Sequence, residues 1–187
     1  MASKLGLEGV SIGLLAGETG LSKSGLFAHF NSKENLQLAI VQYAGLHFTE
    51  AVVNPALKCT RGIARIVDLI ERWIGWGDRL TGGCIFVSAS TEFSDRPGLV
   101  RDLLVQQQQK WLETLKRVAQ SAIKAGDFRG DIDLDQFAFD LYSLLLGVHY
   151  YRRMLGNSHA PQHQRIALMA LLTRYSNPDT DLLKYFS

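Results

Sequence analysis

Apolar residues recur at helical spacing along almost the whole chain, and this periodicity restricts the fold more than any other feature. Between Leu104 and Ala122, leucine, tryptophan, valine and alanine side chains form one stripe. The chain has four prolines, each placed where a helix is expected to begin or end. Residues 84–93 contain strand-forming side chains, but no second strand candidate could pair with them, so we predict a helix there. The expected fold is all-α.

Capping residues divide the chain into its expected helices. Ser11, Ser22 and Ser32 each precede an apolar stripe, as N-cap residues do. They predict three helices. The first begins at residue 12, the second follows Ser22 and ends at about residue 30, and the third extends over residues 33–53 and is ended by Asn54-Pro55. Further helices are expected over residues 62–80, 84–93, 98–125, 134–155 and 162–175.

Residues 11–30 have the pattern of a helix-turn-helix. Ala16 supplies a small side chain where the two helices cross, and Gly20 tolerates a positive φ in the turn. The second helix begins with small or polar residues, which suit contact with base edges in the major groove. The apolar anchors expected on the two helices are Ile12, Leu15, Leu21 and Leu26. Other short helical hairpins share part of this pattern, so these residues alone leave DNA binding open.

The stretch from Ala16 to Leu36 resembles the signature of the TetR family of transcriptional regulators. It reads AGETGLSKSGLFAHFNSKENL, and the family has a Gly-Val-Ser turn, a recognition helix ending in an aromatic, a variable residue, His and Phe, and then Ser-Lys-Glu. The resemblance implies a DNA-binding domain over residues 1–45 and an effector-binding and dimerisation domain over residues 46–187. It also implies a repressor that binds a palindromic double-stranded operator and is released by a small-molecule effector.

The same resemblance implies a role for individual residues of the motif. Ser11 and Lys33, at the starts of two helices, would contact phosphates. The early residues of the recognition helix would face the major groove, and Phe27 and His29 would lie against the DNA backbone. Alternatively, Phe27 could be a core residue and Lys33 a solvated one. The expected DNA-contacting residues are Ser11, Ser22, Lys23, Ser24, Gly25, Phe27, Ala28, His29 and Lys33.

Two features depart from the family pattern. Phe27 stands where tyrosine is common, so one phosphate hydrogen bond is expected to be missing. Family members also begin with a full helix, often after a basic arm, whereas residues 5–9 would form only the last turn of such a helix. Residues 1–45 contain three lysines and three glutamates, so they have no basic excess for DNA. An incomplete first helix would explain this balance, and the coding sequence upstream of Met1 would test it.

Residues 134–155 are apolar around nearly the whole circumference of a helix. Such a helix must be covered on most sides, by its own core and by a partner subunit. With residues 162–175 it would form an antiparallel hairpin, and two hairpins would build a four-helix bundle in a homodimer. The residues expected at this interface are Leu141, Leu145, Leu146, Val148, Ile166 and Met169.

Aromatic residues are spread over the helices expected to enclose an effector. A cavity lined by them would suit a hydrophobic or planar small molecule, although each ring could instead fill the core. The expected ligand-binding residues are Trp73, Trp76, Phe86, Phe93, Trp111, Phe137, Tyr142 and His149. No cofactor or metal is expected, and no chemistry on the ligand.

Motifs of other function classes are missing from the sequence. We find no nucleophile elbow, phosphate-binding loop, zinc-protease motif or Cys-x-x-Cys pair, so catalysis is not expected. Asp133 with Gln136 reads as a capping box rather than as part of a calcium loop. No apolar run reaches the length of a membrane span, and the unpaired Cys59 and Cys84 suit a reducing cytoplasm. The alternative to a regulator is a dimeric small-molecule-binding protein without DNA binding.

Overall fold

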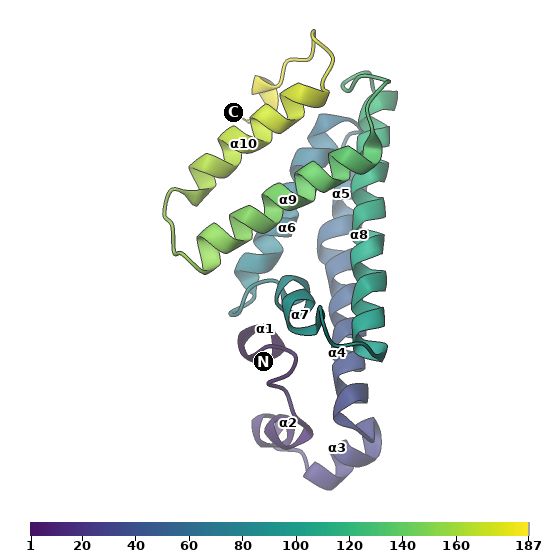
Figure 1. Ribbon diagram of the computed structural model, residues 1–187, viewed down its shortest axis with the longest axis vertical. Helices are drawn as coiled ribbons and strands as arrows, with labels where there is room; N and C mark the ends of the chain where they lie inside the picture. Colours follow the sequence, from purple (N-terminus) through teal and green to yellow (C-terminus); the bar gives the residue numbers. More distant parts are fainter. Residues whose placement is uncertain (187) are drawn as a thin grey trace. The chain divides into compact units, whose positions relative to one another are not determined.

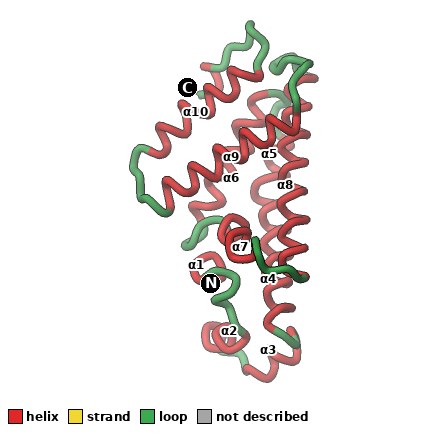
Figure 2. The backbone as a smooth tube through the Cα atoms, viewed as in Figure 1, coloured by secondary structure: helices red, strands yellow, loops and turns green. Residues whose placement is uncertain are grey.

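The computed structural model describes residues 1–186, and helices account for its regular structure, with no extended strand in that range (Figure 2). The expectation of an all-α fold is confirmed. None of the helices described is long and apolar enough to cross a membrane. The helices are α1 (Ala2–Leu5), α2 (Ile12–Thr19), α3 (Lys23–Phe30), α4 (Lys33–Phe48), a π-helical turn (Thr49–Val53), α5 (Asn54–Lys58), α6 (Ile63–Arg79), α7 (Ile85–Phe93), α8 (Leu99–Lys124), α9 (Leu134–Arg153), α10 (Ala160–Tyr175) and a 3₁₀ turn (Leu183–Tyr185).

The chain divides into two compact units, each built from two stretches of sequence. Unit 1 combines Met1–Ala51 with Gly75–Gln109, and unit 2 combines Val52–Ile74 with the chain from Lys110 onward. The helix-turn-helix therefore shares a compact unit with α7 and the first part of α8. The functional division at residues 45 and 46 stays a prediction.

Unit 1 contains two clusters of buried side chains. Under the helix-turn-helix, Val10, Ile12 and Leu26 pack with Leu36 of α4. The second cluster surrounds α7 and includes Leu7 from the segment that precedes α2. The anchor role predicted for Leu21 is wrong, because that side chain is 58% exposed. It stands in the turn between Gly20 and the cap of α3, outside either helix.

The sequence predicts that the helix beginning at Lys33 ends at Asn54-Pro55, but in the structure it continues past these residues. It passes through the π-helical turn Thr49–Val53 into α5, with Pro55 in the first turn of that helix. Proline is common in the first turn of an α-helix, because its fixed φ suits the helical conformation.

Unit 2 contains the C-terminal hairpin, in which α9 and α10 lie side by side and antiparallel (Figure 1). Its buried core includes an aromatic trio. The ring centroid of Phe137 lies 5.4 Å from that of Phe128 and 5.1 Å from that of Tyr175. Phe137 and Phe128 are almost completely buried, so these rings are part of the hydrophobic core.

Candidate nucleic-acid interface and ligand cavity

Three serine caps set the starts of the helices in the DNA-binding segment. The hydroxyl of Ser11 accepts the N–H of Leu14 at 3.1 Å, and that of Ser22 accepts the N–H of Gly25 at 3.1 Å. Ser32 caps α4 in the same way. Each hydroxyl satisfies an N–H group that the first turn of a helix leaves unpaired. The three predicted caps are confirmed.

The turn between α2 and α3 has the geometry that the sequence predicted. Gly20 lies in the left-handed region, with φ 70° and ψ 8°, and its N–H donates to the carbonyl of Ala16. A side chain at this position would be strained, because L-residues rarely adopt such angles. Thr19 closes the end of α2 by donating its hydroxyl to the carbonyl of Leu15 at 2.7 Å.

Helix α3 exposes most of the residues expected to meet DNA. Leu26 is buried against the core, whereas the neighbouring residues face solvent, including Phe27 at 57% exposure. Phe27 is therefore not a core residue, and the alternative that its ring fills the core is wrong. The exposed residues of α3 and its cap are Ser22, Lys23, Ser24, Gly25, Phe27, Ala28 and His29. Ser11, at the start of α2, is exposed as well.

Lys33 is engaged by a neighbouring carboxylate. Its ammonium donates to the carbonyl oxygen of Glu8 at 2.7 Å and lies 3.2 Å from the Glu8 side chain. The same side chain accepts a hydrogen bond from Gln37 and pairs with Arg96 at 3.3 Å. Hydrogen bonds from Gln37 and then Lys33 hold the pKa of the Glu8 carboxyl below its usual value. A phosphate would therefore compete with Glu8 for Lys33.

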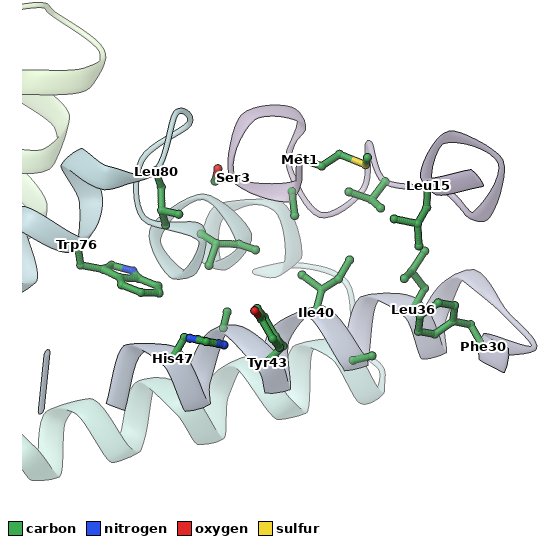
Figure 3. Close-up of a pocket in the computed structure, with 15 residues that line it drawn as sticks. Met1, Ser3, Leu15, Phe30, Leu36, Ile40, Tyr43, His47, Trp76 and Leu80 are labelled. Carbon is green, nitrogen blue, oxygen red and sulfur yellow. The ribbon is translucent and has the colours of Figure 1, made fainter. Parts of the chain in front are cut away.

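A cavity of about 660 Å³ runs along one face of α4, within unit 1 (Figure 3). Leu36, Ile40 and Tyr43 form its α4 wall, with Phe30 at one end and Trp76 at the other. Its lining is mostly apolar, and its volume falls in the range of small-molecule sites. Its full lining is Met1, Ala2, Ser3, Val10, Leu15, Phe30, Leu36, Ala39, Ile40, Tyr43, Ala44, His47, Trp76, Leu80 and Ile85.

The eight aromatic residues predicted to bind a ligand do not form one group within either unit. Unit 1 holds three of them, of which Trp76 lines the cavity and packs with Phe48 at 5.7 Å, while Phe86 also packs with Phe48, at 5.8 Å. The third, Phe93, is buried in the cluster around α7. Unit 2 holds Trp73, Trp111, Phe137, Tyr142 and His149.

Within unit 2, four of the residues predicted to bind a ligand are in ring contact, as two pairs. The Trp73 and His149 centroids are 6.3 Å apart, and those of Trp111 and Tyr142 are 6.4 Å apart. Phe137 belongs to the core trio with Phe128 and Tyr175. A ring packed in this way has little surface to offer a ligand.

Cys84 is buried at the start of α7, and Cys59 is half-buried. Burial is the main influence on the pKa of the Cys84 thiol and raises it above the usual value. The thiolate, which is the reactive form, is thereby disfavoured at neutral pH. Cys84 therefore serves as a small apolar group of the α7 cluster.

The residues predicted at the dimer interface fall into two sets. Leu141 and Leu145 are completely buried within the protomer and Val148 nearly so, which corrects their assignment to a partner-facing surface. A residue covered by its own chain has no area left for a partner. Leu146 and Ile166 are exposed, and Met169 is half-buried.

Several residues that organise unit 1 carry no signal in the sequence and were not predicted. The side chains of Glu8 and Gln37, which are 29 positions apart in the sequence, form a hydrogen bond. Glu92 on α7 accepts N–H groups from a segment 85 residues away. Gln37 is one of the buried polar residues, and it donates to the carbonyl of Leu7 at 3.1 Å. No local pattern marks such contacts, because their partners are brought together by the fold. Within residues 1–186, no group of three or more potential metal ligands occurs.

Comparisons with known proteins agree with this geometry. Residues 1–40 match the family model described as bacterial regulatory proteins of the tetR family. Residues 62–168 match the model of the tetracyclin repressor-like C-terminal domain. No curated protein matches the sequence at a significant level.

Solved structures resemble the chain over most of its length. A TetR transcriptional regulator from Chloroflexus aurantiacus is 26% identical, with a TM-score of 0.78, and the match covers 92% of this chain and 86% of that one. A protein from Saccharomonospora viridis solved with choline is 25% identical, with a TM-score of 0.70 and 88% of each chain covered. AibR, solved with isovaleryl coenzyme A and operator DNA, shares the fold at 21% identity, with a TM-score of 0.71 and 91% of each chain covered. The two family models together span most of the sequence, and the chain belongs to the TetR family of bacterial transcriptional regulators.

Proposed function

We propose that this regulator binds its operator through α3 and the starts of α2 and α4. The observation that carries the proposal is the arrangement of α2, Gly20 and α3, which leaves Lys23, Ser24 and Ala28 exposed beside three capped helix starts. Small residues allow close approach to base edges, and helix N-termini favour phosphate. Ser11, Ser22, Gly25, Phe27, His29 and Lys33 would complete this surface.

The test is binding-site selection from random duplexes with the full chain, followed by affinity measurements over a range of salt concentrations. Lys33→Ala should weaken binding to all duplexes alike and lower the salt slope by about one. Ser24 and Ala28 substitutions should change which duplex is preferred. Selection of no duplex at low salt would favour the alternative, a ligand-binding protein without DNA binding, which the even balance of lysine and glutamate in residues 1–45 also suggests.

The regulator is expected to act as a homodimer built on α9 and α10. One stripe on α9 carries exposed Phe139, Leu146 and Tyr150, and α10 exposes Ile166. The three α9 positions recur at helical spacing, so they lie on one face of the helix, where exposed Ser143 separates Phe139 from Leu146. Two such faces related by a two-fold axis would bury each other in a four-helix bundle. Two recognition helices would then meet a palindromic site with half-sites about 34–36 Å apart.

We also propose that a small apolar effector releases the repressor from DNA, without a cofactor and without chemistry on the effector, in the bacterial cytoplasm. The cavity along α4 supports a site in unit 1, because Trp76 lines it together with Tyr43 and His47. The rings in unit 2, Trp73 with His149 and Trp111 with Tyr142, offer a second location. An effector that prefers the DNA-free form must weaken operator binding. By linkage, the operator must weaken the binding of the effector by the same factor.

Single-tryptophan variants distinguish these two locations. Trp76 reports on unit 1, whereas Trp73 and Trp111 report on unit 2. A panel of planar apolar compounds is titrated against a variant that keeps Trp76 alone and against variants that keep Trp73 or Trp111 alone. Quenching of Trp76 together with weaker binding in an Ala39→Trp variant, which narrows the cavity, would support the unit 1 site. Quenching confined to Trp73 or Trp111 would place the effector in unit 2.

A further inference from the structure

The segment before α2 is held by a carboxylate from α7. One oxygen of Glu92, Oε2, accepts the N–H of Leu7 at 2.8 Å and the N–H of Glu8 at 3.1 Å. Successive backbone N–H groups that converge on one point form a concave site for an anion. Here the anion belongs to a side chain of the same unit, 85 residues further along the chain.

Gly6 is the residue that makes this contact possible. Its φ is +75°, and a Cβ built there would lie 1.8 Å from Oε1 of Glu92. Any other residue would be strained in its backbone, and its Cβ would displace the Glu92 carboxylate from the position that it has here. The conformation of the loop is therefore matched to the position of Glu92.

The same loop carries residues that organise the DNA-binding segment. The carbonyl of Leu7 accepts a hydrogen bond from buried Gln37, and the Glu8 side chain contacts Gln37 and Lys33 of α4. Val10, two residues after Glu8, is buried in the core of the helix-turn-helix. A change in the position of residues 7 and 8 would therefore shift α2 and the environment of Lys33.

A second contact joins the beginning of the chain to the segment before α7. A Cβ at Gly82 would lie 1.5 Å from the carbonyl oxygen of Ser3, so two backbones approach each other closely at that point. Arg96, three residues after α7, pairs with the Glu8 carboxylate at 3.3 Å. The residues before and after α7 thus both contact the N-terminal segment, and Glu92 lies between them.

We propose that Glu92 is a positioning residue for operator recognition: it holds the loop of residues 6–9 on α7 and thereby fixes the orientation of α2 and α3. The part that concerns DNA rests on the proposed function, whereas the hold on the loop does not. Helix α7 also contributes Ile85 to the wall of the cavity along α4. A change in that wall can therefore reach the recognition helix through the Glu92 carboxylate, alongside the contacts of Gly82 and Arg96 with the N-terminal segment.

The test compares Glu92→Ala and Glu92→Gln with the matched control Asp95→Asn. All three variants remove one negative charge, and Asp95 is an exposed neighbour that contacts Ser94 rather than the loop. Hydrogen exchange is measured at the amides of Leu7 and Glu8. Affinity is measured for the selected operator and for a random duplex, and thermal unfolding confirms that each variant folds.

Glu92→Ala should accelerate exchange at both amides and lower the ratio of operator to random-duplex affinity, each by about tenfold, because hydrogen bonds to a charged acceptor are lost. Glu92→Gln keeps a neutral acceptor and should lie between wild type and Glu92→Ala. Asp95→Asn should leave exchange and the affinity ratio unchanged. A purely structural role would instead lower both affinities together.

Unchanged amide exchange in Glu92→Ala would overturn the hold on the loop. Faster exchange with an unchanged affinity ratio, or with equal losses on both duplexes, would overturn the role in recognition. If the wild-type chain selects no duplex at all, the proposed function fails. The exchange measurement still decides whether Glu92 holds the loop of residues 6–9.

Discussion

The hydroxyl of Tyr175 donates a 2.6 Å hydrogen bond to the carboxylate of Asp140, joining the last turn of α10 to the first half of α9. Gln136 and Arg174 also contact Asp140. The ring of Tyr175 packs in the aromatic core of unit 2, so the bond joins that core to the surface of the hairpin. It stabilises the two helices on which the proposed dimer depends.

Tyr175→Phe is expected to reduce the free energy of unfolding by about 1–2 kcal/mol at neutral pH, because it removes a hydrogen bond to a charged acceptor. Chemical denaturation measures this loss. Tyr151→Phe is the control, since it removes the same atom from an exposed ring. Equal stability of the two variants would contradict a stabilising role for the Tyr175–Asp140 bond.

The same pair predicts a dependence of stability on pH. Burial, followed by the bond to Asp140, raises the pKa of Tyr175 to about 12. A raised pKa means that the neutral phenol is favoured in the folded state, so its contribution is complete below the ordinary pKa of 10 and is lost as pH rises from 10 towards 12. The hydrogen bond from Tyr175 lowers the pKa of Asp140, whose contribution is lost as pH falls through the acidic range. Denaturation of Tyr175→Phe between pH 9 and about 12 should lack the alkaline component.

Two adjacent leucines of α9 are expected to respond differently to a charge. Leu145 is completely buried in the protomer, so Leu145→Asp should unfold unit 2, because an unpaired buried charge costs several kcal/mol. Leu146 is 37% exposed on the apolar stripe, so Leu146→Glu should give a folded monomer. Circular dichroism follows folding, and sedimentation follows assembly. A wild-type chain that is monomeric at micromolar concentration would contradict the dimer.

Glu8→Gln is expected to strengthen binding to every duplex, by up to about fivefold at low salt, because it removes the carboxylate that competes with phosphate for the Lys33 ammonium and leaves only the bond to the Glu8 carbonyl. The salt slope should stay close to the wild-type value, because the contact between Lys33 and phosphate forms in both proteins and only the competing carboxylate is lost. Glu18→Gln, which removes the same charge from the exposed end of α2, controls for the general electrostatic effect. In a Lys33→Ala background the gain should disappear, and a gain that persists there would show that Lys33 is not the group released.

Two glycines of the DNA-binding segment should give opposite results when replaced by alanine. Gly17 lies inside α2 with open space around it, so Gly17→Ala should stabilise the helix by up to about 1 kcal/mol. Gly20 also has open space, but its φ is +70°, so Gly20→Ala should cost about 1–2 kcal/mol. Amide hydrogen exchange in α2 and α3 measures both changes. A neutral Gly20→Ala would mean that the turn can adopt another conformation.

Much of the local structure could be predicted from the sequence, because its causes lie within a few residues. The caps at Ser11, Ser22 and Ser32 act on N–H groups three positions away. Gly20 meets the backbone requirement of a turn only four residues from its partner Ala16. The family resemblance rests on this same short stretch, so the order of residues alone was enough to identify the helix-turn-helix, whereas the exposure of Leu21 and Phe27 came from the structure.

The tertiary structure decided which apolar residues are covered and which distant polar groups meet. Helical spacing placed Leu145 and Leu146 together in one hydrophobic helix, but packing buries the first and exposes the second. The contact of Glu92 with Leu7 spans 85 residues. Periodicity describes the faces of a single helix and cannot say which neighbour covers each face. That choice depends on the packing of helices that are distant in sequence, because burial and hydrogen bonding act through space.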